Sequence, residues 1–138
     1  MNKEWYEKHV AIFVQRVHKT VKKDRHVVMK NFPKGSCGVA SLLLAEYFKR
    51  LDSDDVFDYV CGWRGDWSHA WLETNDYIID VTAHQFQDYS DSFVQSKESV
   101  WHKEFRIEIR HDADLTTYDA RTVIEYTTYY EKLGLIEI

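Results

Sequence analysis

Cysteine, proline and glycine are scarce in this chain of 138 residues, which has two cysteines, one proline and five glycines. Two cysteines are too few for a disulfide scaffold, and the other two counts exclude collagen-like and linker-rich chains. The longest apolar runs, 11–14 and 42–45, are far shorter than the roughly 20 residues that a membrane-spanning helix needs. The first residues also lack the apolar core of a signal peptide. We therefore expect a cytoplasmic protein with no membrane partner.

The charge balance is mildly acidic, with 18 Lys plus Arg against 23 Asp plus Glu and a formal net charge of −5. A module that binds a nucleic-acid duplex usually carries a basic face, so we expect no nucleic-acid partner. Hydrophobic residues make up 44% and aromatic residues 15% of the chain, enough to bury a core. The length suits a single domain over residues 1–138 and leaves the oligomeric state open.

Three segments have the periodicity of helices. Apolar residues recur at steps of three and four over Lys3–Lys23 and over Cys37–Leu51, and the second segment carries the wider apolar stripe. Ser36 precedes the second helix as a suitable N-cap. A last helix is predicted over 118–133, ending at Gly134.

Strand patterns follow the second helix. Residues 56–63, 68–73 and 77–82 are rich in β-branched and aromatic residues, and 104–110 alternates apolar with charged residues as a half-exposed strand does. The stretch 83–103 shows no clear pattern. Helices followed by sequential strands predict an α+β fold with an antiparallel sheet, on which the helix that starts at Cys37 packs.

The predicted hairpin brings a histidine close to an aspartate. A two-residue loop at Thr74–Asn75 places His69 directly opposite Asp80, with Cβ atoms about 5 Å apart. A loop at Asn75–Asp76 makes them diagonal neighbours on the same face, and only a three-residue loop separates them. An ionised carboxylate on a half-buried sheet needs a partner, so we expect the two side chains to interact.

Cys37 stands at the first turn of its predicted helix, between Gly35 and Gly38. The positive end of the helix dipole favours an anion there, which lowers the thiol pKa. Nucleophilic catalysis needs an activated atom, a base and a group that orients the base. Cys37, His69 and Asp80 supply these three if the sheet packs against the start of the helix.

Other interpretations of these residues remain open. Taken singly, Cys37 is more often an inert core thiol, His69 a satisfied strand histidine and Asp80 a solvated or turn-capping carboxylate. Zinc is a rival for the group as a whole, since suitable ligands are present, but no Cys-x-x-Cys pair occurs. The candidate zinc ligands are Cys37, Cys61, His69 and His84.

Three sequence pieces resemble the transglutaminase-like branch of the papain-like cysteine-enzyme superfamily. They are Gly-Ser-Cys-Gly-Val-Ala at 35–40, Ser-His-Ala-Trp-Leu-Glu at 68–73 and Ile-Asp-Val-Thr at 79–82. The resemblance implies a papain-like core, with Cys37 as nucleophile, His69 as base and Asp80 as the residue that orients the base. The order Cys, His, Asp matches that of the family. An aromatic residue often follows the family's nucleophile, and Gly38 stands there instead.

We therefore expect a cysteine-dependent acyl-transfer enzyme that acts on a protein or peptide amide through a thioester, without a cofactor. Water is always available as the acceptor, so a protease or deamidase is favoured over a protein-crosslinking transglutaminase. A binding module that keeps the fold without turnover is a further alternative, and so is a zinc-binding domain. An intact Cys37, His69 and Asp80 argues against the binding module, because a binding surface needs no thiolate.

The oxyanion hole should include the backbone N–H of Cys37 and a second donor. Asn31 lies at the offset where papain-like proteases place a side-chain amide, although a turn before Pro33 is the favoured interpretation of this residue. His84 and Gln85 follow the Asp80 strand and are interpreted as loop residues, and Cys61 as a structural thiol. Further candidates for the oxyanion hole or substrate groove are Ser36, Trp63 and Trp71.

Overall fold

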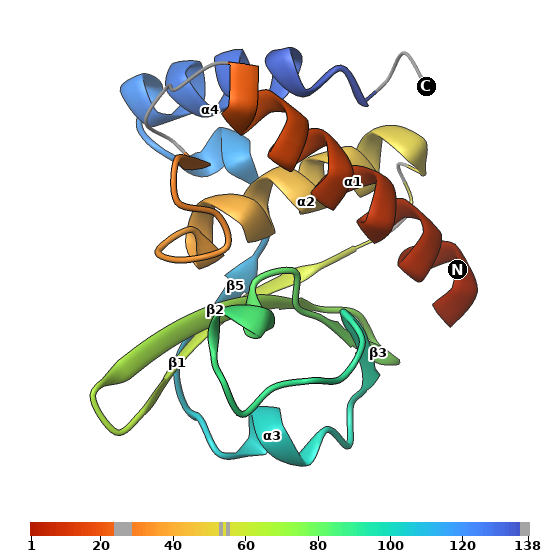
Figure 1. The fold of residues 1–138 in the computed structure, drawn as a ribbon, viewed down its shortest axis with the longest axis vertical. Coiled ribbons are helices and arrows are strands. Elements are labelled where there is room, and N and C mark those ends of the chain that lie inside the picture. Colours follow the sequence, from red (N-terminus) through yellow and green to blue (C-terminus); the bar gives the residue numbers. More distant parts are fainter. Residues whose placement is uncertain (24–28, 53, 55, 136–138) are drawn as a thin grey trace.

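The computed structural model describes residues 1–23, 29–52, 54 and 56–135. Three helices, α1 (Lys3–Lys23), α2 (Cys37–Leu51) and α4 (Ala120–Leu133), form a layer on one side of a β-sheet (Figure 1). The first two helices have the bounds that the sequence predicts, and Gly134 ends α4 in the left-handed conformation. The helix layer therefore follows directly from sequence periodicity.

The sheet has five strands in the order β4-β3-β2-β1-β5, and every neighbouring pair is antiparallel. The predicted α+β class with an antiparallel sheet is confirmed. Short elements complete the chain: η2 (Ala83–Gln85), α3 (Val100–Lys103) and η3 (Leu115–Thr117). The strands are β1 (Asp58–Arg64), β2 (Trp67–Glu73), β3 (Tyr77–Ile79), β4 (Val94–Ser96) and β5 (Arg106–Asp112).

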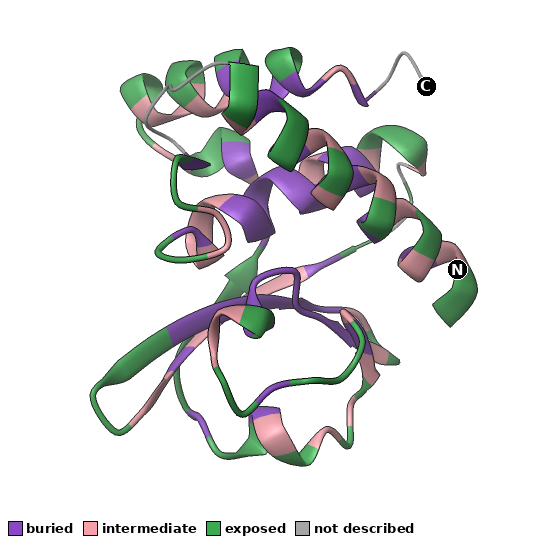
Figure 2. Cartoon of the chain, viewed as in Figure 1, coloured by how far each residue is buried: buried purple, intermediate pink, exposed green. Residues whose placement is uncertain are grey.

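The main hydrophobic core lies between the helices and the sheet. Helix α2 is buried along most of its length, while α1 and α4 expose their outer faces (Figure 2). Apolar side chains from α2 and from the strands meet in this core, among them Leu43, Leu44, Leu72 and Ile79. Helix α2, which carries the wider apolar stripe, is more buried than α1, because it packs between α1 and the sheet.

A second, smaller core covers the other face of the sheet. We call residues 80–105 the strap, because this segment leaves β3, adds β4 to the sheet edge and returns through α3 on the far side of the sheet (Figure 1). Phe86 and Trp101 of the strap pack on a buried cluster made of Val60, Trp71, Ile78 and Phe105. The sheet therefore has a covered face on both sides where it carries His69.

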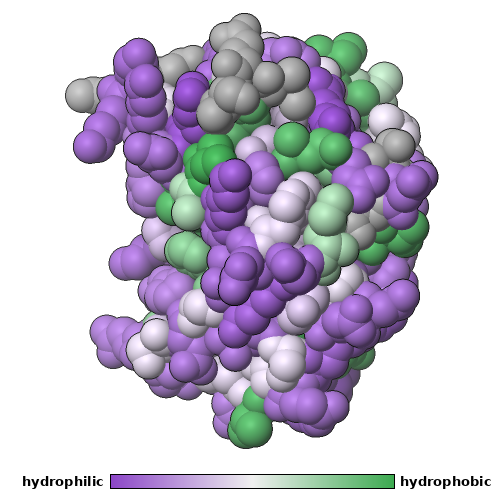
Figure 3. All heavy atoms as spheres, turned by 90° about the vertical axis from the view of Figure 1, so that its right-hand side faces the viewer, coloured by the Kyte–Doolittle hydropathy of each residue, from purple (hydrophilic) through white to green (hydrophobic). Residues whose placement is uncertain are grey.

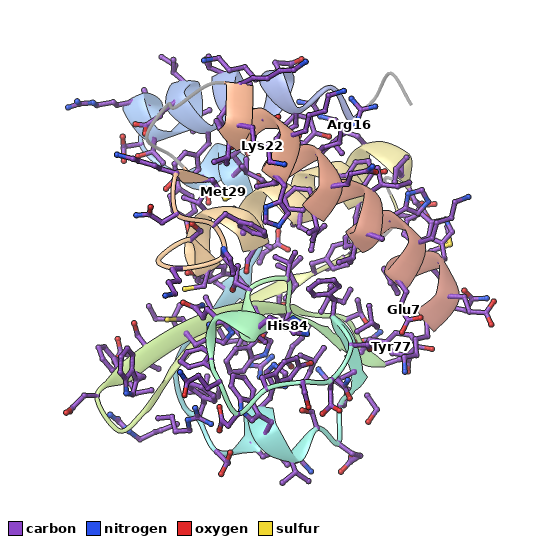
Figure 4. All side chains as sticks on the ribbon, in the orientation of Figure 1. Glu7, Arg16, Lys22, Met29, Tyr77 and His84 are labelled. Carbon is purple, nitrogen blue, oxygen red and sulfur yellow. The ribbon has the colours of Figure 1, made fainter. Side chains whose placement is uncertain are left out.

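The first helix also contacts the edge of the sheet. Glu7 of α1 and Tyr77 of β3 lie at the same end of the molecule (Figure 4), and the rings of Tyr6 and Tyr77 are 5.8 Å apart. Ser92 of the strap donates a hydrogen bond to Glu7 at 3.4 Å. These contacts tie the helix layer to the hairpin and to the strap.

Strand β5 is more exposed than the half-exposed strand that the sequence predicts. All seven of its residues are exposed, and Ile107 and Ile109 keep 41% and 39% of their surface accessible. Alternation predicts one covered face, but β5 lies at the edge of the sheet, beyond the main core and the strap. The face shown in Figure 3 is mostly hydrophilic, with hydrophobic residues in small separate groups. Within the described ranges, no helix is both long and apolar enough to cross a membrane.

A glycine marks the irregularity where β1 pairs with β5. The register shifts between Cys61 and Gly62, and a Cβ on Gly62 would lie 2.7 Å from the backbone oxygen of Arg106. We expect Gly62→Ala to lower the free energy of unfolding by about 1–3 kcal/mol, because a backbone contact has no flexible end that can yield. Urea denaturation measures this loss.

Gly38→Ala is the matched control for that measurement. Its Cβ would meet only the hydroxyl of Tyr59, at 3.1 Å, and alanine is favoured over glycine within a helix by roughly 0.5–1 kcal/mol. We expect a smaller change in stability than at Gly62. Equal losses in the two variants would contradict the proposed backbone clash.

Candidate active site

The β2–β3 hairpin brings His69 and Asp80 together. Leu72 lies opposite Ile79, and the backbone N–H of Thr74 donates to Tyr77, so the loop is Asn75–Asp76, the second of the two predicted registers that keep the pair on one face. Strand β3 ends at Ile79, and the Asp80 side chain accepts a hydrogen bond from His69. His69 Nε2 and Asp80 Oδ2 are 2.7 Å apart.

Cys37 joins this pair from the start of α2. Its sulfur interacts with the His69 side chain and with the backbone N–H groups of Gly38 and Ala70, and these interactions lower the pKa of its thiol. Because the β3 ladder reaches only as far as Leu72, the Ala70 N–H has no partner in β3 and is open to the sulfur. Since Nε2 of His69 is bound to Asp80, we assign Nδ1, which also lies 3.4 Å from Gln85 Nε2, as the ring nitrogen that faces Cys37. The three predicted residues thus form one contiguous group.

The electrostatics of the group favour a thiolate–imidazolium pair. Burial alone would lower the pKa of His69, but the negative charge and hydrogen bond of Asp80, with a contribution from Cys37, raise it to about 9. Burial alone would raise the pKa of Cys37, but the hydrogen bond and charge of His69 and the two backbone donors lower it overall. The pKa of Asp80 is also lowered, because the two histidines that bond to it outweigh its burial. Near neutral pH the proton therefore belongs on His69.

The pair lies in a dry, aromatic environment. His69 and Asp80 are both 0% exposed, and the imidazole packs among four rings at centroid distances of 5.0–5.8 Å. An isolated charge at such a position would be costly, so the acid and the base stabilise each other. The four rings belong to Trp71, Phe86, Trp101 and Phe105.

A cavity of about 630 Å³ opens beside the group. Gly35 comes from the loop before Cys37, Ser68 directly precedes His69, and Gln85 lies 3.4 Å from the His69 ring, so the cavity wall is formed by the segments next to both reactive residues. Cys37 itself is partly exposed, whereas His69 is not. Of the two, the thiol is therefore the one that is accessible from solvent. The lining residues are Lys34, Gly35, Arg64, Trp67, Ser68, Gln85, Phe86, Gln87 and Asp88.

Two further residues belong to the group, and sequence reasoning did not give them this place. Gln85 lines the cavity, and its Nε2 lies 3.4 Å from His69 Nδ1. His102 is buried in the strap, and its Nε2 lies 2.7 Å from Asp80 Oδ2. Sequence reasoning interpreted Gln85 as a loop residue and assigned no partner to His102. Their positions depend on how the strap folds back onto the sheet, and no periodic pattern in the local sequence predicts that.

Two of the predicted oxyanion or substrate residues lie elsewhere. Asn31 is exposed, and its carbonyl accepts from the N–H of Lys34 in a turn around the proline. Within the described part of the chain, no hydrogen bond joins its side chain to Cys37 or His69. Ser36 is buried, but its hydroxyl donates to the Lys34 carbonyl at 3.2 Å and does not cap α2. Both side chains are therefore assigned to the loop before α2.

The structure also places the two tryptophans, Trp63 and Trp71, differently from the predicted oxyanion or substrate-groove role. The indole N–H of Trp63 donates to Glu108 at 2.8 Å, which commits its polar end to a strand neighbour. Trp71 is 1% exposed, donates to Glu73 at 2.9 Å and packs on the His69 ring, so it supports His69 from the core and is not part of the wall of this cavity. Trp67, at 68% exposure, lines the cavity instead.

The zinc alternative finds no cluster to support it. Among the residues that the structure describes, no three His, Cys, Asp or Glu side chains form a group that could hold a metal ion. His84, labelled in Figure 4, packs on Tyr89 and Phe93 at 5.1 and 4.8 Å. Cys61 is a free thiol whose pKa is raised by burial and by the nearby Cys37 and Glu108.

Comparison with known proteins returned no match to a protein-family model, a curated protein or a solved structure.

Proposed function

We propose that this protein is a cysteine-dependent acyl-transfer enzyme that acts on a protein or peptide amide, and that its core is papain-like, of the transglutaminase-like kind. The observation that supports this most is the contiguous group of Cys37, His69 and Asp80, in which a sulfur at a helix start contacts an imidazole held by a buried carboxylate. A helix packed on an antiparallel sheet supplies the sulfur, in line with the sequence resemblance.

In the first step, the Cys37 thiolate attacks the carbonyl carbon of the amide and forms a carbon–sulfur bond. His69 Nδ1 donates its proton to the leaving nitrogen as the carbon–nitrogen bond breaks, which leaves a thioester and a free amine or ammonia. Asp80 keeps the imidazole in position and stabilises its charged form without taking the proton.

In the second step, His69 removes a proton from water, and the water oxygen attacks the thioester carbonyl. The carbon–sulfur bond breaks, so a carboxylic acid leaves and the thiolate–imidazolium pair is restored. Cleavage of a backbone amide makes the enzyme a protease, and cleavage of a glutamine side-chain amide makes it a deamidase. An amine in place of water would give a crosslink.

The tetrahedral intermediate needs donors for its oxygen. The backbone N–H of Cys37 lies at the start of α2, where N–H groups have no partner within the helix. We assign the second donor to the Gln85 carboxamide, because it lines the cavity and lies 3.4 Å from His69 Nδ1. Gln85 thereby takes the role that the sequence suggested for Asn31.

The proposal is tested by incubating a whole proteome with the wild-type protein and, in parallel, with Cys37→Ala. Mass spectrometry of both samples reads new chain ends, the mass gain of side-chain deamidation and crosslinked peptides in the same run. We expect one of these three modifications with the wild type and none above background with Cys37→Ala, because the variant lacks the atom that forms the thioester. Equal modification in both samples would end the proposal.

A Gln85→Ala variant extends this experiment. Removal of one oxyanion donor lowers turnover by about 10²–10³-fold in a known hydrolase, and we expect a loss of that order here. Gln87→Ala is the matched control, because Gln87 also lines the cavity but has no hydrogen bond to His69 in the described structure. If both variants keep wild-type turnover, Gln85 is not the donor.

A further inference from the structure

We propose that His102 is a positioning residue of this site, which acts through Asp80 to keep the carboxylate ionised and directed at His69. The inference rests on the proposed function and adds a fourth side chain to it. Its basis is that one oxygen atom of Asp80 bonds to two imidazoles, one in β2 and one in the strap.

The contacts of Asp80 are complete and almost symmetrical. Oδ2 lies 2.7 Å from Nε2 of His69 and 2.7 Å from Nε2 of His102, while Oδ1 accepts from the N–H of Thr82 at 3.3 Å. Asp80 is 0% and His102 3% exposed, so water does not replace either imidazole. A carboxylate without solvent depends on such donors to remain charged.

His102 is itself held in a defined orientation. Its Nδ1 lies 2.7 Å from the Ser99 hydroxyl, which also caps α3 by accepting from the His102 backbone N–H at 3.4 Å. With Ser99 donating to Nδ1, the hydrogen of a neutral ring is on Nε2 and points at Asp80. The unbroken sequence of contacts therefore runs from Cys37 through His69, Asp80 and His102 to Ser99.

The surroundings contain little that could replace His102. The rings of Trp71 and Trp101 pack on it at 4.9 Å each, and Tyr89 lies at 5.9 Å with its hydroxyl donating to the Ser92 carbonyl. The cations on this side have partners of their own: Arg64 stacks over the Trp101 ring and pairs with Asp88, Lys97 and Arg110 pair with Glu73, and Lys103 pairs with Glu98. Among the described residues, the titratable groups that face the carboxylate are therefore His69, His102 and Tyr89, and Cys37 is linked to it only through His69.

His102 also fixes the strap to the site. The strap begins at Asp80 and returns to it 22 residues later through His102. The same segment supplies Gln85 and Phe86 to the cavity wall. The hydrogen bond between His102 and Asp80 therefore also fixes the strap, which forms part of the cavity wall.

The test is the pH dependence of Cys37 alkylation by iodoacetamide in the full chain, with Cys61 as an internal reference. His102→Leu keeps apolar bulk but has no donor, so Asp80 loses one of its two imidazoles, holds His69 less firmly and lets the Cys37 thiol regain its proton. We expect the midpoint of the profile to rise by about one pH unit, which slows alkylation about tenfold near pH 6. His102→Gln restores an N–H donor and should stay within about threefold of the wild type.

Circular dichroism and thermal melting establish that each variant is folded. A folded His102→Leu whose profile overlays that of the wild type would overturn the proposal, because a purely structural residue leaves the profile in place. If His102→Leu does not fold, Ser99→Ala frees the outer side of the ring and should move the midpoint in the same direction, and an unmoved midpoint overturns the proposal. A wild type without a fast Cys37 would instead count against the proposed function itself.

Discussion

Iodoacetamide is expected to alkylate Cys37 about 100-fold faster than Cys61 near pH 6. At that pH an ordinary thiol is almost wholly protonated, whereas His69 and two backbone donors favour the thiolate at Cys37. Burial raises the pKa of Cys61, so its thiolate is scarcer still. Both cysteines are partly exposed, which makes their accessibility comparable. Peptide mass spectrometry after timed quenching gives the two rates separately.

The pH dependence separates activation from simple exposure. The rate at Cys61 should climb steadily as its thiol ionises, so the ratio of the two rates shrinks toward high pH. Acyl transfer should fall as the pH passes about 9, because His69 then loses the proton that the leaving amine requires. Cys61→Ala should keep the fast reaction and Cys37→Ala should abolish it. Slow, equal labelling of both cysteines would leave Cys37 an ordinary thiol.

Asp80→Ala is expected to lower the free energy of unfolding by about 3–5 kcal/mol, and the melting temperature by about 10–20 °C. The substitution removes a fully buried charge and leaves two buried imidazoles without their acceptor. Asp80→Asn preserves the shape and one acceptor oxygen, so its loss should be smaller, about 1–3 kcal/mol. Urea denaturation of the three proteins measures both differences.

The loss in Asp80→Ala should itself depend on pH. Asp80 has a lowered pKa in the fold, so its contribution is present above the unfolded value of about 3.9 and fades as the pH falls through the folded one. His69 has a raised pKa, so its contribution is full below about 6.5 and is lost as the pH rises through about 9. The difference between wild type and Asp80→Ala should therefore be largest between about pH 4 and pH 6.5. A difference that grows toward pH 10 would contradict the ion pair.

Local sequence signals were sufficient for the bounds of α1 and α2 and for the contact between His69 and Asp80. The spacing of apolar residues gives the bounds of α1 and α2, because each helix is long enough to repeat its period several times. The loop length alone determines the register of the hairpin, and two of the three simplest loops keep His69 and Asp80 on one face. The position of Cys37 at a helix start was likewise a local inference.

Long-range packing determines what the sequence could not predict. Strand β4 and helix α3 span three and four residues, too few to show a period. The strap brings His102 to Asp80 across 22 positions, and only the folded chain records that contact. Trp71 was placed in a groove because tryptophan suits one, yet its indole is buried by the same strap. Trp71, Gln85 and His102 were thus misjudged because their surroundings depend on residues 80–105.

The length of β3 limits how this hairpin can vary between related chains. If β3 continued beyond Ile79, its backbone would take the Ala70 N–H that now bonds to Cys37 and would draw Asp80 into the ladder. Insertions near Ile79 that lengthen β3 would therefore make the sheet more regular and would lower the reactivity of Cys37. Extra residues at the Asn75–Asp76 loop would not change the contacts of Cys37, His69 and Asp80. The hairpin can therefore vary in length at this loop but not at the Ile79 end.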